Sequence, residues 1–148
     1  MVNRPADQPA PARPVHLVVG SVSAAQAHDL PAARRVHDAL AAALRARAAP
    51  AAPQIVTDFH RLADDALAHL PCICIGHPEV NALSAFLADK LPPALVIDGA
   101  LAVQFNLADR EPVALLWGVD HAATNRAADL FTQRFLDAFA DAVAHECR

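Results

Sequence analysis

The chain has little of what several common protein classes need. Only four of its 148 residues are glycine, and neither a G-x-G-x-x-G nor a Walker pattern occurs. We therefore expect no glycine-rich cradle for a nucleotide. Lysine occurs once against eleven arginines, which indicates a bacterial genome rich in G and C. The net charge of −4 argues against a nucleic-acid partner.

Cysteines and long apolar runs are also scarce. Three cysteines form no disulfide framework. Cys72 and Cys74 stand two apart on a presumed strand, where parallel side chains have a poor geometry for a bridge. The apolar runs are shorter than the ~18–20 residues that cross a bilayer. Residues 1–14 lack the apolar core of a secretion signal, so the sequence predicts a cytoplasmic protein with no membrane segment.

What is present indicates one folded domain behind a short arm. Residues 1–14 are rich in proline and alanine and predict a flexible arm, or alternatively an arm swapped onto a partner subunit. Hydrophobic residues make up 55% of the chain, enough for a single α/β domain over residues 15–148.

Hydrophobic spacing and turn residues give the order of elements. Strands are expected over residues 15–20, 54–58, 72–75, 94–97, 101–107 and 112–117, and helices over 29–48, 59–70, 78–91 and 120–146. Residues 21–28 are expected to form a loop, and Leu62, Ala66 and Leu70 to face the core. The last three strands form a β-meander through Asp98-Gly99 and the polar turn of residues 108–111. The fold class is α/β, a three-layer sandwich with a mixed, mainly parallel sheet, a C-terminal meander and a long closing helix.

Three of the predicted strands end in glycine. If these strands run the same way, Gly20, Gly76 and Gly118 gather at one carboxyl edge of the sheet, where such folds bind ligands. A flavodoxin-like, Rossmann-like order, with the first and third strands adjacent, would place a shallow pocket between Gly20-Ser21 and Gly76-His77.

Two strand-to-helix turns supply the predicted ligand-binding residues. Each has a glycine, a histidine and an asparagine one turn into the helix. With the serine after the first strand, they give the predicted ligand-binding set Ser21, His77, Asn81, His121 and Asn125. The alternative interpretation is that the acidic residues of these turns satisfy the helix starts and the asparagines bond locally.

Other reactive groups look like packing. Cys74 with His77 suggests a nucleophile and base, but a cysteine in an apolar strand is usually inert. A zinc site from Cys72, Cys74 and His69 or His77 lacks a fourth ligand. We expect no metal and no cofactor.

Two segments resemble a known family. Ile75-Gly76-His77-Pro78-Glu79-Val80-Asn81 resembles the strand-Gly-Gly-Pro-x-x-Asn-helix turn of α/β domains in archaeal surface-layer proteins. Residues 115–128 are similar to the family's later strand-Gly-x-Asp-x-x-x-Thr-x-x-Ala-Ala-helix turn, and the intervening meander matches in order. The resemblance covers roughly residues 70–130, with His77 in place of the second glycine. It implies the fold and no cell-surface role.

The sequence supports two functions, and a structural domain excised from a larger chain is a third alternative. The first is a non-catalytic ligand-binding or protein-interaction module that takes a small polar molecule or a protein partner; a homodimer is left open. The alternative is a small hydrolase or transferase with His77 or His121 as general base, and with Ser21, Ser23 or Asn81 positioning the substrate.

Overall fold

The computed structural model describes residues 11–108 and 111–148. The first ten residues of the predicted arm and residues 109–110 of the predicted polar turn lie outside this part. The last two residues of the predicted arm, Arg13 and Pro14, belong to the first strand. Within the described residues, no helix is both long enough and apolar enough to span a membrane.

The described residues form a six-stranded mixed sheet in the order β2-β1-β3-β6-β5-β4. The neighbouring strands β2, β1, β3 and β6 are parallel, and β5 and β4 continue as an antiparallel meander. Both edge strands contain a proline, Pro53 in β2 and Pro93 in β4. The elements are β1 (Arg13–Val19), α1 (Ser23–His28), α2 (Leu30–Ala46), β2 (Ala51–Thr57), α3 (Asp58–Ala63), the 3₁₀ helix η1 (Asp65–His69), β3 (Cys72–Ile75), α4 (Ala82–Leu87), β4 (Pro93–Ile97), β5 (Leu101–Asn106), β6 (Val113–Gly118), α5 (His121–Arg134) and α6 (Leu136–Glu146).

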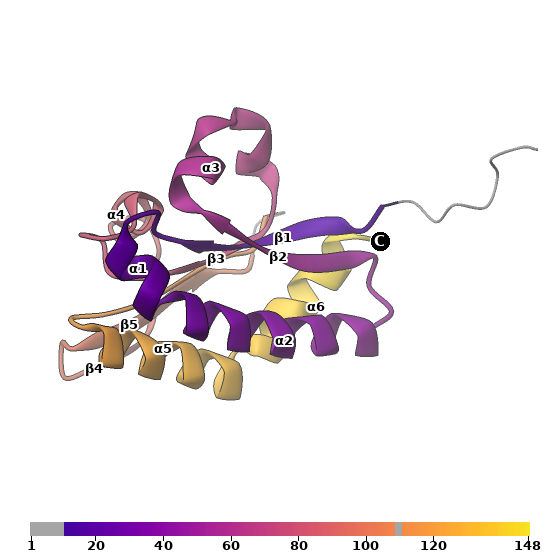
Figure 1. Cartoon of the computed structure of the whole chain (residues 1–148). Helices are drawn as coiled ribbons and strands as arrows, with labels where there is room; N and C mark the ends of the chain where they lie inside the picture. Colours follow the sequence, from indigo (N-terminus) through magenta and orange to yellow (C-terminus); the bar gives the residue numbers. More distant parts are fainter. Residues whose placement is uncertain (1–10, 109–110) are drawn as a thin grey trace, which may run out of the picture.

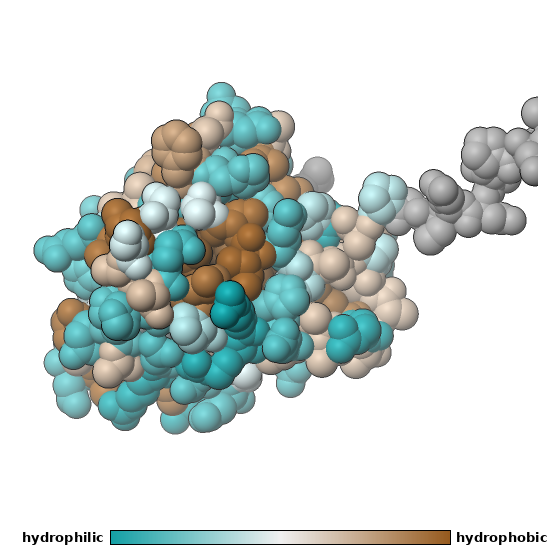
Figure 2. Space-filling model, viewed as in Figure 1, coloured by the Kyte–Doolittle hydropathy of each residue, from teal (hydrophilic) through white to brown (hydrophobic). Residues whose placement is uncertain are grey.

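Helices cover both sides of the sheet, but unequally (Figure 1). The side packed by α2, α5 and α6, called here the thick face, buries a large cluster that includes Leu40, Phe131 and Phe139. On the side packed by α3, η1 and α4, called the thin face, the hydrophobic cluster of the described chain has only seven buried residues: Val18, Val56, Cys72, Cys74, Leu83, Leu87 and Leu115. Figure 2 shows apolar surface between α3 and α2, along the β2 edge of the sheet. The three-layer α/β sandwich predicted from the sequence is confirmed.

The starts of two helices differ from the prediction: α1 forms in a predicted loop, and α4 begins later than predicted. Residues 21–28 are not all loop, because the alanines after Ser23 favour a short helix, α1. The helix predicted from residue 78 begins only at Ala82. The reason is Asn81, whose side-chain oxygen accepts the N–H groups of Leu83 and Ser84 and so caps α4.

The closing helix differs in one respect from the predicted single helix over residues 120–146. It is divided into α5 and α6 at Phe135, whose φ of −126° and ψ of −12° are not helical. Backbone bonds still run from the Phe135 N–H to Phe131 O and from the Phe139 N–H to Phe135 O. The ring of Phe135 packs on Phe105 of β5, so the bend lies where the helix meets the sheet.

Candidate functional site

The three glycines do gather at one edge. Because β1, β3 and β6 are parallel neighbours, Gly20, Gly76 and Gly118 all lie at their carboxyl ends. The orientation on which the predicted site depends is therefore present in the structure.

The space between Gly20 and Gly76 is nevertheless occupied. A Cβ added at Gly20 would collide with the carbonyl oxygen of Val80, because the turn of residues 77–81 folds over this glycine. At Gly76, which has a φ of 130°, an added Cβ would lie 2.9 Å from Asp29 Oδ2. The shallow pocket predicted between these two turns is thus filled by the protein's own backbone and by Asp29.

Ser21 is held by a buried carboxylate. Its N–H donates to Asp58 Oδ1 at 2.9 Å. Asp58 further accepts the N–H groups of Phe59 and Ala82. Burial disfavours the charged form of this group, but these hydrogen bonds outweigh it and lower the pKa of Asp58. Asp58 therefore joins the end of β1 to α3 and α4, a role that the sequence prediction missed.

Asn81 is fully used inside the fold. Only 1% of the residue is exposed. Its Nδ2 donates to the carbonyl oxygens of Val18 and Ile75, both at 3.1 Å, while its oxygen caps α4. The amide thus has no hydrogen-bonding capacity left for a ligand, which agrees with the alternative interpretation of a local hydrogen-bonder.

The two predicted histidines lie in separate clusters. His77 Nδ1 accepts the N–H of Glu79 at 3.0 Å, and its ring packs edge-on against Trp117 at 5.5 Å. His121 Nδ1 instead donates to Asp29 Oδ1 at 3.3 Å, and its ring stacks on His28 at 4.2 Å.

The cluster around His121 contains a buried carboxylate oxygen that has no hydrogen-bond partner among the described residues. Asp29 is 0% exposed, and among the described residues its Oδ2 is a buried side-chain atom without a hydrogen-bond partner. Burial raises the pKa of Asp29, opposed by its hydrogen bond to His121. Asn125 braces the cluster, because its Nδ2 donates to the carbonyl oxygens of His121 and His28 and its Oδ1 accepts from Arg35. Asp29 stands at the start of the helix predicted over residues 29–48, but its side chain makes no cap bond.

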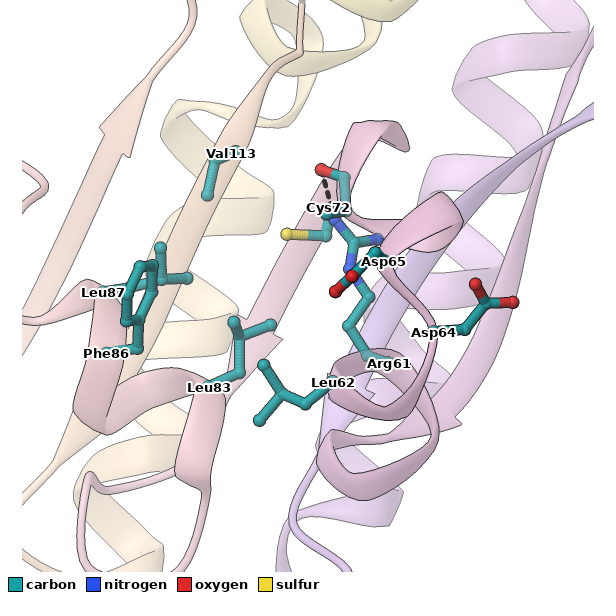
Figure 3. Close-up of a pocket in the computed structure, with 10 residues that line it drawn as sticks. Arg61, Leu62, Asp64, Asp65, Cys72, Leu83, Phe86, Leu87 and Val113 are labelled. Carbon is teal, nitrogen blue, oxygen red and sulfur yellow. Dashed lines mark hydrogen bonds between the residues drawn. The ribbon is translucent and has the colours of Figure 1, made fainter.

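A pocket lies elsewhere, on the thin face between α3–η1 and α4 (Figure 3). Its volume is about 260 Å³. Cys72 and Val113 of the sheet line it below, and side chains of the helices line its sides: Arg61, Leu62, Asp64, Asp65, Ala68, Leu83, Phe86 and Leu87. Leu62 and Phe86 are 49% and 56% exposed, so the wall opens to solvent through apolar side chains.

The cysteines near this pocket are not activated. Burial raises the pKa of the Cys72 thiol to about 11, and it raises the pKa of Cys74 as well. Both side chains are therefore neutral thiols near pH 7, and Cys74 bonds to Ser84 and Asn81. Among the described residues, no group of three or more His, Cys, Asp or Glu is arranged to hold a metal ion.

Comparison with known proteins adds nothing to this geometry. No family model matches the chain, and no curated protein matches it. The resemblance to archaeal surface-layer domains stays a prediction.

Proposed function

We propose that this chain is a non-catalytic ligand-binding module and that it binds a small molecule in the pocket of the thin face. The observation that carries this proposal is the pocket itself, an opening of about 260 Å³ with mostly apolar walls. Ligand sites are typically concave and apolar with a few polar groups, and the volume of this one lies slightly below their usual range. We also propose that the neighbouring strands β2, β1 and β3 make the fold Rossmann-like or flavodoxin-like.

The hydrogen bonds that the predicted residues of the carboxyl edge already make favour a site on the thin face instead. Asn81 and Ser21 are engaged by protein groups, and the turn of residues 77–81 fills the space between the two glycine turns. By contrast, Leu62 and Phe86 of the pocket wall touch solvent, and their apolar side chains have no hydrogen bond to lose. Binding there would leave the fold's hydrogen bonds intact.

A screen of unfolding temperature against a metabolite library tests this proposal. The pocket variant is Leu62→Asp, which places a charge in a half-exposed wall. The matched control is Phe59→Asp, which changes an exposed apolar residue of the same helix that does not line the pocket. A ligand at 100 times its Kd should raise Tm by about 5–10 °C in the wild type and in the control.

The result that supports the proposal is loss of the Tm shift in Leu62→Asp alone. His77→Ala and His121→Ala serve as variants of the carboxyl edge. Shifts that survive in Leu62→Asp but disappear in an edge variant would place binding at the edge and overturn the proposal.

A hydrolase or transferase is the second candidate, and one observation favours it. The Asp29–His121 contact is an arrangement that orients an imidazole: with Nδ1–H donated to Asp29, the Nε2 lone pair is left to accept a proton. Since the His77 Nδ1 accepts a backbone N–H, we assign the base of this candidate to His121.

Assays with ester, phosphoester and amide substrates test this second candidate. We expect any turnover to fall at least 100-fold in His121→Gln and also to fall in Asp29→Asn, while His77→Gln leaves it unchanged. Turnover that survives His121→Gln would exclude this histidine as the base.

A further inference from the structure

The wall of the thin-face pocket contains a buried arginine, Arg61. Arg61 is only 6% exposed, although it belongs to a short surface helix. Its Nη1 donates to His16 Nδ1 at 3.0 Å, and its Nη2 donates to the carbonyl oxygens of Ala68 and Leu70 at 3.3 and 2.8 Å. These bonds tie α3 and η1 to β1.

None of the three acceptors carries a negative charge. Burial, followed by the neighbouring positive charges of Arg61 and His60, lowers the pKa of His16 to about 4, so this ring is neutral near pH 7. Ion pairs are found for several other arginines of the described chain, but none for Arg61 within 4 Å. Among the described residues, the guanidinium in the pocket wall therefore has no ion-pair partner within 4 Å, which is rare because buried charges are usually paired.

Arg61 also keeps hydrogen-bonding capacity. A guanidinium has five N–H donors, and the three bonds to His16, Ala68 and Leu70 use three of them. For the Nε–H and the second Nη1–H, the described residues supply no acceptor. Figure 3 shows Arg61 reaching to the side of Cys72, whose sulfur points into the space between Arg61 and Val113.

We propose that the pocket binds a small monocarboxylic acid with an apolar body, whose carboxylate accepts from Arg61. This inference rests on the proposed function. The apolar body would lie among Leu62, Leu83, Phe86 and Leu87, and the volume of about 260 Å³ holds on the order of ten non-hydrogen atoms. The neutral thiol of Cys72 adds an apolar surface that does not repel the anion.

The two aspartates of the lining restrict the charge of the ligand. Asp64 and Asp65 are both exposed, and Asp64 accepts the N–H of Ala66. Their negative charge opposes phosphates and dicarboxylates more than it opposes a single carboxylate held against the buried guanidinium. The site thus selects a monoanion over a multiply charged one.

Three probes of one length test this assignment: hexanoate, hexanamide and hexylamine. Binding to the full chain at pH 7 is followed by NMR chemical-shift titration. We expect hexanoate to bind about 10- to 100-fold more tightly than hexanamide, because its charged acceptor bonds to a guanidinium. Hexylamine should bind most weakly, and Leu62→Asp should weaken the binding of hexanoate and hexanamide.

A variant and a salt series give a second measurement. In Arg61→Gln, hexanoate and hexanamide should bind equally, and added NaCl should weaken hexanoate more than hexanamide in the wild type. If Arg61→Gln does not fold, the three-probe series on the wild type decides alone.

The outcomes separate this inference from the proposed function. Hexanamide binding as tightly as hexanoate, with loss in Leu62→Asp, overturns the carboxylate assignment and leaves the pocket as a binding site. Hexylamine binding as tightly as hexanoate also overturns the carboxylate assignment. Absence of hexanoate binding overturns the inference as well, and the library screen then decides whether the pocket binds at all.

Discussion

The two faces of the sheet share the same strands but differ in how they are packed. On the thick face, α2, α5 and α6 cover the strands with aromatic and aliphatic side chains, and residues such as Phe131 and Phe139 are completely buried. On the thin face, shorter helices leave an opening, and the fold is held by polar groups such as Asp58, Asn81 and Arg61. Stability is therefore expected to reside mainly on the thick face and ligand binding on the thin one.

The largest effect should follow from a cavity in the thick face. Phe139→Ala removes a fully buried ring that packs on Phe131 at 6.0 Å, and should lower the free energy of unfolding by about 3–5 kcal/mol. Leu87→Ala on the thin face, beside an existing pocket, should cost about 2 kcal/mol. Urea denaturation measures both. Equal losses would mean that the faces share the stability evenly.

The next largest loss of stability is expected at Gly76, at the carboxyl end of β3 between the two faces. Gly76→Ala must adopt a φ of 130° and push against Asp29, so it should lower the free energy of unfolding by more than about 2 kcal/mol. Gly99→Ala is the matched control, because φ is also positive there but open space surrounds it; about 1 kcal/mol is expected. A similar loss in both variants would show that Asp29 makes room.

A smaller effect is a pH dependence located on the thin face. Because the pKa of His16 is lowered to about 4, the unfolded chain binds a proton below pH 6.5 that the folded chain does not yet bind. The stability contribution of this group is thus complete above pH 6.5 and declines as pH falls toward 4, with a slope of up to about 1.4 kcal/mol per pH unit. Denaturation of the wild type and of His16→Gln between pH 7 and 4 measures it. The decline should be smaller in the variant, where carboxylates such as Asp58 still contribute to it, and an unchanged decline would assign it entirely to other groups.

The smallest effect should be at the rim of the pocket. Phe86→Ser changes a residue that is 56% exposed, so the free energy of unfolding should change by no more than about 0.5 kcal/mol. The same variant should weaken hexanoate binding severalfold, because the ring forms part of the apolar wall. A large loss of stability would show that Phe86 belongs to the core of the thin face.

The sequence predicted the thick face well and the thin face poorly. On the thick face, the four-residue spacing of Phe131, Phe135 and Phe139 could be assigned to a helix without knowledge of its partners. On the thin face the phase of α3 was wrong: Leu62 is 49% exposed and Ala66 is exposed, whereas Arg61 is buried. Periodicity sorts apolar from charged residues, so it does not find a guanidinium whose acceptors come from distant segments.

The candidate site shows the same limit. The edge at which the three glycines gather could be predicted, because parallel strands and glycine ends are local signals. The rest of the site depends on contacts between segments far apart in the sequence. Val80 fills the predicted pocket, Asp29 holds His121, and Asp58 holds Ser21. A carboxylate at the end of the second strand was a signal for Asp58, while nothing in the sequence indicated the pairing of Asp29.

The prolines of the two edge strands have a consequence for association. Pro53 in β2 and Pro93 in β4 have no N–H to donate to an added strand. Strand-by-strand growth of the sheet into fibrils is therefore interrupted at both of its borders. In a concentrated solution, copies of this chain are protected against edge-to-edge aggregation at the two places where an open sheet is most vulnerable.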